Sequence, residues 1–385
     1  MTIPIGMVAG EPSGDLLAAR VIHGLQQANN AVHCHGIGGP HMQEAGFTPW
    51  EPMDALSVFG YVDALKRLPT LIATYKRVQK RWLTQPPAAF VGIDAPDFNL
   101  RIQEKLKSAG IPTIQFVSPS IWAWRYERIN KIREAVSHML VLFPFEEALY
   151  QREGIPVTYV GHPMAQQIPL QPESVPARHA LGVPDNVPLL AVLPGSRASE
   201  IKALAPRFLA AVQQLQHDQP DLHIAIPMVN AKRQQEFQKY LHQFPIKNCQ
   251  LVEKSWTVLA AADAVLTASG TATLEAALFK QPMVISYVLS PLMKKIMAWQ
   301  SGQDKPLLPW VGLPNILAQE GIVPELLQEQ AQPDKLAEAT YTALNDACYR
   351  KQLQQRYISL HQALKRDTAS IAAKAILQEA GVYAG

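Results

Sequence analysis

Short apolar runs rich in β-branched residues alternate with stretches of helical periodicity along most of the chain. In the first half, these runs predict strands at residues 3–9, 31–37, 88–93, 111–117, 138–143 and 157–160. In the second half, they predict strands at residues 189–193, 222–229, 250–252, 264–267 and 283–287. Helical sequence between successive strands is typical of βαβ units, whose parallel sheets are covered by helices on both faces. The pattern therefore predicts an α/β fold, and helical periodicity continues from residue 334 to the end.

The alternation breaks after Gly161-His162-Pro163, and residues 166–188 contain five prolines. Such a stretch is typical of a connection between domains, and 385 residues are enough for two or three domains. We expect two Rossmann-like, doubly wound domains at residues 1–165 and 166–335. A helical tail at 336–385 would cross back or be exchanged between subunits. Open parallel sheets bind ligands at the carboxyl ends of their strands, so a cleft between the two sets of strand ends is predicted.

Composition narrows the class of protein. Hydrophobic residues make up 48% and charged residues 17% of the chain, which excludes a disordered polymer. The net charge of +3 is too small to indicate a nucleic-acid partner. Cys34, Cys249 and Cys348 are far apart, so neither a disulfide framework nor a structural zinc site is expected, and a reducing compartment fits best. The sequence shows neither a secretion signal nor an apolar stretch of the roughly 18 residues that span a membrane.

Two turns in the second half carry residue types that bind phosphate. In the first, Gly195 allows close approach of a ligand, Ser196 can donate to an anion at a helix N-terminus, and Arg197 offers a planar fork for phosphate oxygens. An ordinary strand-to-helix turn with a solvated arginine is the alternative.

The second turn contains Ser269, Gly270 and Thr271, again between a predicted strand and a predicted helix. Glu275 follows one helical turn later on the same face, where a carboxylate can hold the two hydroxyls of a ribose. A solvated or capping glutamate is the alternative interpretation. Two such turns in one domain are nevertheless more specific for a nucleotide than either one alone.

The first half has a glycine-bearing turn, GEPSGD, that contains Glu11, Ser13 and Gly14. It lacks the G-x-G-x-x-G fingerprint and the Lys-Ser/Thr of a P-loop, which disfavours a classical dinucleotide or ATP site. Ser13 and Asp15 are also suited to cap the first helix. We leave the role of this turn in the predicted cleft open.

Asp94 ends the strand predicted at residues 88–93 and is the first candidate for a general base. Asp97 is expected to cap the next helix. His162 is a second acid/base candidate, although a hinge histidine is often structural. Neither a D-x-D pair nor a histidine cluster occurs, so a metal ion is not indicated.

A basic amphipathic helix is predicted between residues 64 and 93, a stretch without acidic residues. Its apolar side chains fall on one face, and Pro69 is expected in its first turn. This pattern is typical of docking on an anionic membrane, although a core-facing stripe with a solvated basic face is the alternative. The candidate membrane-facing residues are Lys66, Arg67, Lys76, Arg77, Lys80, Arg81 and Trp82.

Taken together, these motifs resemble the lipid-A-disaccharide synthase family. The resemblance covers about residues 8–325, and Pro12 departs from the small residue usual at its position. The matching strings occur in family order and are GEPSGD, GIGGPHM, GIDAPDFN, VSPSIWAWR, LFPFE, VGHPM, LPGSR, SGTATLE and LPN.

The resemblance implies a two-domain GT-B fold whose C-terminal domain binds most of the donor nucleotide. It implies inverting transfer from UDP-2,3-diacylglucosamine to 2,3-diacylglucosamine 1-phosphate, which gives a β-1,6-linked disaccharide 1-phosphate and UDP. It further implies that no metal or other cofactor takes part. The enzyme would act as a peripheral protein at the cytoplasmic face of the inner membrane, and an exchange of C-terminal segments would form a homodimer.

Residue by residue, Asp94 matches the family's proposed base and Arg197 its essential arginine. Ser196, the turn at 269–271, Glu275 and Asn315 match its nucleotide-binding motifs. Two other functions stay open. A UDP-sugar 2-epimerase would share the fold but need more acid/base groups and no membrane helix, and a nucleotide-binding module would need no strand-end carboxylate.

Overall fold

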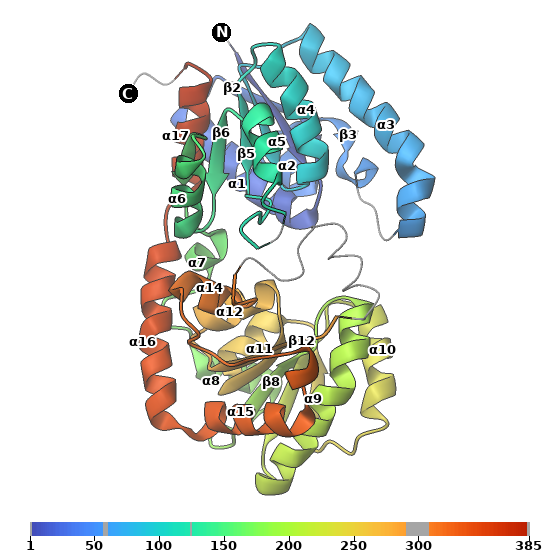
Figure 1. Ribbon diagram of the computed structural model, residues 1–385, viewed down its shortest axis with the longest axis vertical. Coiled ribbons are helices and arrows are strands. Elements are labelled where there is room, and N and C mark those ends of the chain that lie inside the picture. The colour runs from blue at the N-terminus through green and yellow to red at the C-terminus, as the bar shows by residue number, and fades with distance from the viewer. Residues whose placement is uncertain (1, 57–60, 124, 290–307, 383–385) are drawn as a thin grey trace. The chain divides into compact units, whose positions relative to one another are not determined.

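The computed structural model describes residues 2–56, 61–123, 125–289 and 308–382, without the side chains of residues 61–68. The chain forms two compact units, each with a parallel sheet flanked by helices (Figure 1). The first unit contains Met1–Gln166 and Leu364–Gly385, and the second contains Gln167–Ala363. The helical C-terminal part is thus divided between the units.

The sheet of the first unit has seven parallel strands in the order β3-β2-β1-β4-β5-β6-β7. The strands are β1 (Ile3–Ala9), β2 (Val32–Gly38), β3 (Thr48–Pro52), β4 (Ala89–Ile93), β5 (Thr113–Phe116), β6 (His138–Val141) and β7 (Val157–Tyr159). The helices are α1 (Pro12–Ala28), α2 (Pro40–Glu44), α3 (Tyr61–Thr84), α4 (Pro96–Ser108), α5 (Arg128–Ala135), α6 (Pro144–Arg152), α7 (Pro163–Gln167) and α17 (Thr368–Glu379).

Helices cover both faces of this sheet because successive residues of each strand point to opposite sides. Ile5 and Met7 of β1 pack in one core with α1 and α17. Val8 faces the other way and packs in a second core with α3 and α4. The sheet is therefore doubly wound, as the sequence predicted, and it has a buried cluster on each side.

The sheet of the second unit has six parallel strands in the order β10-β9-β8-β11-β12-β13. The strands are β8 (Leu189–Leu193), β9 (His223–Pro227), β10 (Cys249–Val252), β11 (Ala264–Ala268), β12 (Met283–Tyr287) and β13 (Glu325–Leu327). The helices are α8 (Ser174–Leu181), α9 (Ala198–Asp218), α10 (Ala231–Leu241), α11 (Ser255–Ala261), α12 (Thr271–Leu278), α14 (Leu313–Ala318), α15 (Pro333–Asn345) and α16 (Ala347–Leu364). On one face, Leu190 and Val192 of β8 pack against α9 and α15.

The structure corrects three predictions at helix starts, those for Ser13, Asp15 and Pro69. The first helix begins at Pro12 with Glu11 at its N-cap, so Ser13 and Asp15 do not cap it. Proline suits the first position of a helix because the N–H that it lacks would have no helical partner there, which explains how this turn accommodates Pro12. Pro69 lies inside α3 and not in its first turn.

Candidate active site

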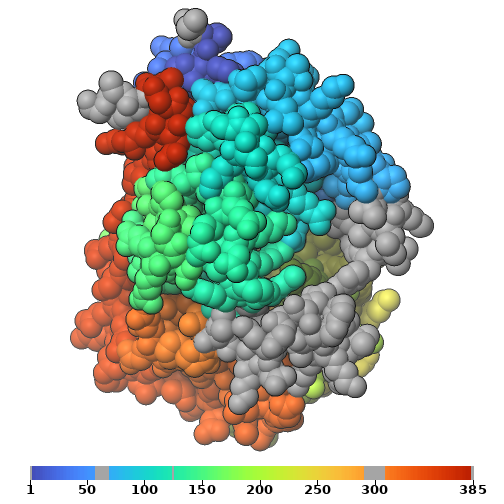
Figure 2. Space-filling model, turned by 45° about the horizontal axis from the view of Figure 1, so that its top comes forward, coloured from blue at the N-terminus to red at the C-terminus, as the bar shows by residue number. Residues whose placement is uncertain are grey.

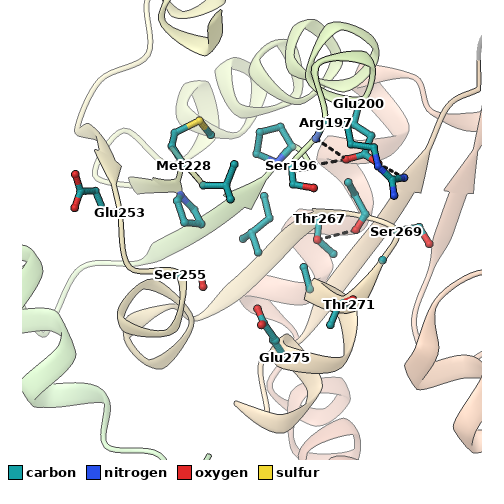
Figure 3. A pocket seen from close by; sticks show the side chains of 18 residues that line it. Ser196, Arg197, Glu200, Met228, Glu253, Ser255, Thr267, Ser269, Thr271 and Glu275 are labelled. Carbon is teal, nitrogen blue, oxygen red and sulfur yellow. Dashed lines mark hydrogen bonds and ion pairs between the residues drawn. The ribbon is translucent and has the colours of Figure 1, made fainter. Parts of the chain in front are cut away.

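The strand order of each sheet reverses direction once, at the kind of position where open α/β sheets bind ligands. In the second unit, β8 pairs with β11. The strand order continues through β9 and β10 on one side of this pair and through β12 and β13 on the other. The turns that leave β8 and β11 are those at Gly195 and Gly270. A pocket of about 490 Å³ lies between them, and its lining contains every donor-site residue predicted from the sequence except Asn315 (Figure 3).

The Gly195 turn is shaped by Glu200. Gly195 has a φ of 105°, and a Cβ atom there would lie 2.5 Å from Oε2 of Glu200. The same oxygen accepts hydrogen bonds from the backbone N–H groups of Ser196 and Arg197, at 3.0 and 3.1 Å. Glu200 thus engages two backbone N–H groups at the start of α9. The Arg197 side chain is 76% exposed and donates to Oε1 of Glu200 at 3.4 Å, and it lines the pocket together with Ser196.

The Gly270 turn is open on the side where a side chain would project. Gly270 has a φ of 150°, and among the described residues no atom beyond its two chain neighbours lies within 4 Å of the position of a Cβ. The Ser269 hydroxyl donates to the carbonyl oxygen of Val311 at 3.0 Å, which leaves its lone pairs as acceptors. Thr271 is exposed at the first position of α12. This turn can therefore admit a bulky polar ligand without a change of backbone.

Glu275 lines the pocket from the second turn of α12 (Figure 3). Its side chain is half-buried, and this burial raises the pKa of its carboxyl, while a hydrogen bond from Trp256 opposes the shift. A carboxyl in this position can accept hydrogen bonds from neighbouring hydroxyl groups of a ligand.

Asn315 lies outside the pocket lining. It is fully buried, its side-chain oxygen accepts from the Val323 N–H at 2.9 Å, and its Nδ2 donates to Oε1 of Glu325 at 2.8 Å. Glu325 also accepts from the N–H groups of Val311 and Gly312. The Asn315 side chain therefore fixes the segment that supplies the Ser269 acceptor, and it faces protein on all sides.

In the first unit, the order reverses between β1 and β4, and the turns after these strands hold Gly10 and Asp94. Oδ1 of Asp94 accepts a hydrogen bond from the Gly10 N–H at 3.0 Å. Oδ2 is buried and has no hydrogen-bond partner among the described residues. Asp94 and Ala95 have φ values of 51° and 36°, a strained backbone of the kind that gathers at functional sites. The Asp94 carboxyl thus has one oxygen held and the other without a donor.

Burial raises the pKa of Asp94 to about 7, the backbone N–H groups of Gly10 and Glu11 oppose this shift, and the nearby charge of Glu11 adds to it. A carboxyl with a pKa near 7 is a more effective general base than an ordinary aspartate. Glu11 and Ser13 are exposed on the adjoining turn, whereas Gly14 is buried. A Cβ atom on Gly14 would lie only 1.6 Å from Oδ2 of Asp94, so the carboxyl occupies the space that this glycine leaves.

The two neighbouring aspartates have structural partners. Asp15 is buried and accepts from the N–H groups of Gly39, His41 and Met42, which fixes the start of α2. Asp97 does not cap α4, whose N-cap is Ala95, and instead forms an ion pair with Arg128. Both carboxylates are thus engaged by protein groups, whereas Oδ2 of Asp94 has no hydrogen-bond partner among the described residues.

His162 is 7% exposed, and burial lowers its pKa to about 4. Its ring stacks on Phe143 with the centroids 5.5 Å apart, and its Nδ1 accepts from the Met164 N–H at 3.3 Å. The ring is therefore uncharged at neutral pH, and its contacts agree with the structural alternative.

Sequence reasoning missed a buried carboxyl in the same unit, that of Glu146. It accepts from Nε1 of Trp122 at 2.9 Å and from the Phe143 N–H at 3.1 Å, and burial raises its pKa to about 7. Trp122 belongs to the motif SPSIWAWR and Glu146 to LFPFE. These two motifs were the sequence signal that could have drawn attention to Glu146. The contact shows how these two distant strings fold against each other.

The α3 helix forms a ridge on the surface of the first unit (Figure 2). Trp82 is fully buried and packs on Trp50 and Phe90, so its assignment to a membrane-facing surface was wrong. The helical period showed which residues share a face, but not that the Trp82 face meets the sheet. Arg81 stacks over the Trp50 ring at 3.8 Å, and Arg77 pairs with Glu51 at 2.7 Å.

The exposed part of α3 keeps most of the predicted basic residues. Lys76, Arg77, Lys80 and Arg81 are exposed, as is Ile72, and the side chains of Lys66 and Arg67 lie outside the described part of the structure. A groove of about 420 Å³ is lined by Leu71, Ile72, Tyr75, Lys76, Asp97, Phe98 and Arg101. Within the described ranges, we found no helix both long and apolar enough to cross a membrane.

Known proteins of one family match this chain over nearly its whole length. The family model described as lipid-A-disaccharide synthetase matches residues 5–378. The lipid-A-disaccharide synthase of Bordetella petrii is 61% identical over 390 residues, covering 99% of each chain. That of Chromobacterium violaceum is 44% identical over 381 residues, covering 98% of this chain and 97% of the relative.

Two solved structures share the fold at low sequence identity. The S. aureus MnaA–UDP co-structure has a TM-score of 0.63 at 12% identity, covering 100% of this chain and 98% of the other. Acinetobacter baumannii MurG has a TM-score of 0.58 at 16% identity, covering 98% and 100%. These likenesses show a GT-B fold. Together with the family match, they show that the chain belongs to the lipid-A-disaccharide synthase family of glycosyltransferases, which act in lipid A synthesis.

Proposed function

We propose that the protein transfers the sugar of UDP-2,3-diacylglucosamine to 2,3-diacylglucosamine 1-phosphate, with inversion at the anomeric carbon. The products are the β-1,6-linked disaccharide 1-phosphate and UDP. The observation that carries this proposal is the Asp94 carboxyl, whose pKa is about 7 and whose Oδ2 has no donor among the described residues. Such a group can take the proton of an acceptor hydroxyl.

The chemical step needs one base and a stabilised leaving group. The 6-hydroxyl of the acceptor attacks the anomeric carbon, its proton passes to Asp94, and the bond from that carbon to the UDP oxygen breaks. Arg197 and the start of α12 would stabilise the diphosphate that leaves, so that neither a general acid nor a metal ion is required. Glu275 would accept hydrogen bonds from the ribose hydroxyls.

A transfer assay with radiolabelled donor and both lipid substrates tests this function. We expect a labelled disaccharide 1-phosphate and an equal amount of UDP. Conversion of the donor to an epimeric UDP-sugar without an acceptor would instead indicate a 2-epimerase. Binding of UDP without any product would indicate a nucleotide-binding module.

Arg197→Lys is expected to lower kcat/KM by about tenfold or more, because a lysine cannot replace a bidentate contact to phosphate. The affinity for UDP should fall in parallel, which equilibrium binding can measure. The matched control is Arg233→Lys, since Arg233 pairs with Glu236 on α10 and does not line the pocket. Wild-type activity and UDP affinity in Arg197→Lys would exclude this role.

We further propose that the enzyme works at the cytoplasmic face of the inner membrane, as a peripheral protein and as a homodimer. Its two substrates carry acyl chains, so they reside in a bilayer. Exposed Lys76 and Lys80 follow the exposed Ile72 about one and two helical turns later on α3, which places cationic and apolar side chains on one surface. Anionic lipids attract such a surface.

Lys76→Gln combined with Lys80→Gln is expected to weaken binding to anionic vesicles about thirtyfold at low salt. The estimate follows from about 1 kcal/mol per basic residue near the surface. Sedimentation with phosphatidylglycerol vesicles at two salt concentrations measures the change, which should shrink at high salt. The double variant Lys232→Gln and Lys239→Gln removes the same charge from α10 and should bind as wild type does. Equal binding by all three proteins would show that α3 only packs on its own unit.

A further inference from the structure

Arg125 lies in the segment that connects β5 to α5, next to the turn that carries Asp94. At the start of this segment, the N–H of Asp94 donates to the Phe116 carbonyl at 3.2 Å, and Gln115 donates to the Asp94 carbonyl at 3.3 Å. At its end, Arg128 forms an ion pair with Asp97. The segment is therefore joined to the Asp94 turn before Arg125 and to the first turn of α4 after it.

The backbone around Arg125 is strained at several positions. Val117, Ser120 and Arg125 have φ values of 75°, 50° and 61°, a region that side chains other than glycine rarely adopt. Strain of this kind persists only where the surroundings fix it, and it gathers at ligand sites. Here Glu146 holds Trp122 through its indole N–H, as described above. The Arg125 carbonyl accepts from the Arg128 N–H at 3.0 Å, which fixes the Arg125 backbone just before α5.

The Arg125 guanidinium has a donor that the described residues do not satisfy. Its Nε is buried without a hydrogen-bond partner among the described residues, because its ion pair with Oε1 of Glu127 is 3.8 Å long, too long for a hydrogen bond. The side chain as a whole is 43% exposed, so a ligand can reach it. A buried N–H without an acceptor is costly, and each such group calls for an explanation.

Other cations nearby are already engaged. Arg133 pairs with Glu153 at 2.6 Å, and the Lys107 ammonium donates to the carbonyl oxygens of Arg133 and Val136. Arg128 is held by Asp97. Among these four cationic side chains, Arg125 is the one with an unsatisfied buried donor.

We propose that Arg125 binds the phosphate monoester of the acceptor and so selects an acceptor that carries it. This inference rests on the proposed function, in which the acceptor presents its 6-hydroxyl to Asp94. A phosphate monoester carries a charge of about −1.5 to −2 at neutral pH and three acceptor oxygens. The planar guanidinium matches such a group with two parallel hydrogen bonds, one of which would use Nε. Arg125 touches no reacting atom and is a specificity residue.

The test compares two ligands and three proteins in detergent micelles. The dissociation constants of 2,3-diacylglucosamine 1-phosphate and of the same lipid without phosphate are measured by titration calorimetry. Wild type should bind the phosphorylated lipid about 10- to 100-fold more tightly, as expected for hydrogen bonds to a charged group. Arg125→Gln should bind both lipids alike, and Arg125→Lys should retain part of the preference.

Arg133→Gln is the matched control, because it removes a nearby arginine that already has a partner, and it should keep the wild-type preference. UDP affinity and melting temperature show whether each variant is folded. A preference in Arg125→Gln equal to that of wild type, or a wild type without preference, would overturn the inference. Because the readout is binding, a wild type that prefers the phosphorylated lipid but forms no disaccharide would count against the proposed function alone.

Discussion

Asp94→Asn is expected to lower the turnover number by about 10²–10⁴-fold, the usual contribution of a general base. The amide fills the same space but cannot take the proton of the acceptor hydroxyl. Affinity for UDP should be unchanged, because the pocket that would hold the nucleotide lies within the second unit and Asp94 lies in the first. Steady-state kinetics with both lipid substrates and UDP titration measure the two effects.

The pH dependence should identify the same group. Burial raises the pKa of Asp94 to about 7, and only the ionised carboxyl is a base, so wild-type turnover should rise with pH and level off above about 7. Ionisation of Asp94 has the opposite effect on the stability of the fold. Because the folded-state pKa lies above its ordinary value, ionising Asp94 costs stability between about pH 4 and pH 7. At pH 8, Asp94→Asn should therefore melt at the same temperature as wild type or higher.

Asp97→Asn makes the same chemical change on a side chain that is 78% exposed. It removes a surface ion pair with Arg128, which is worth about 0–1 kcal/mol, so turnover should stay close to wild type. If Asp94→Asn kept more than about a tenth of the wild-type turnover, Asp94 would not be the base, and Glu11 on the adjoining turn would be examined next.

The sequence predicted the interior of both sheets and missed one edge strand of each. The central strands are buried on both faces, so they read as continuous apolar runs, and β1, β8 and β12 were predicted with their observed limits. The edge strands β3 and β13 have no such run. The sequence of β3 is TPWEP, and its two prolines argue against a strand unless it lies at an edge.

The sequence predicted those parts of the candidate site in which a suitable residue type directly follows a predicted strand. These are the glycine-bearing turns and the strand-end carboxylate of Asp94. What could not be predicted is how side chains distant in sequence meet. The burial of Trp82 depends on Phe90 and Trp50, and the role of Asp15 depends on the start of α2. Glu200 is different, because a glutamate three residues after the helix N-cap is a local capping-box signal that could have been used.

Gly14→Ala is expected to lower turnover by about 100-fold or more, although Gly14 itself carries no reactive group. The added Cβ would lie 1.6 Å from Oδ2 and 2.6 Å from Cγ of Asp94. The backbone of α1 is fixed by its packing in the core, so the carboxyl must turn away and lose its 3.0 Å hydrogen bond from the Gly10 N–H. A displacement of about 1 Å at a reacting group can cost about 10²-fold in rate. Initial-rate kinetics measure the loss.

A second substitution separates displacement of the base from general damage to the helix. In Gly14→Ala combined with Asp94→Ala, the clash is gone, so the melting temperature lowered by Gly14→Ala alone should recover while activity stays at the level of Asp94→Ala. Gly321→Ala is the matched control, because among the described residues a Cβ there meets only Nε1 of Trp310, at 3.4 Å, and its activity should equal that of wild type. Full activity in Gly14→Ala would show that the Asp94 carboxyl need not occupy this position for catalysis. Loss of both stability and activity that Asp94→Ala cannot rescue would place the effect in α1 itself.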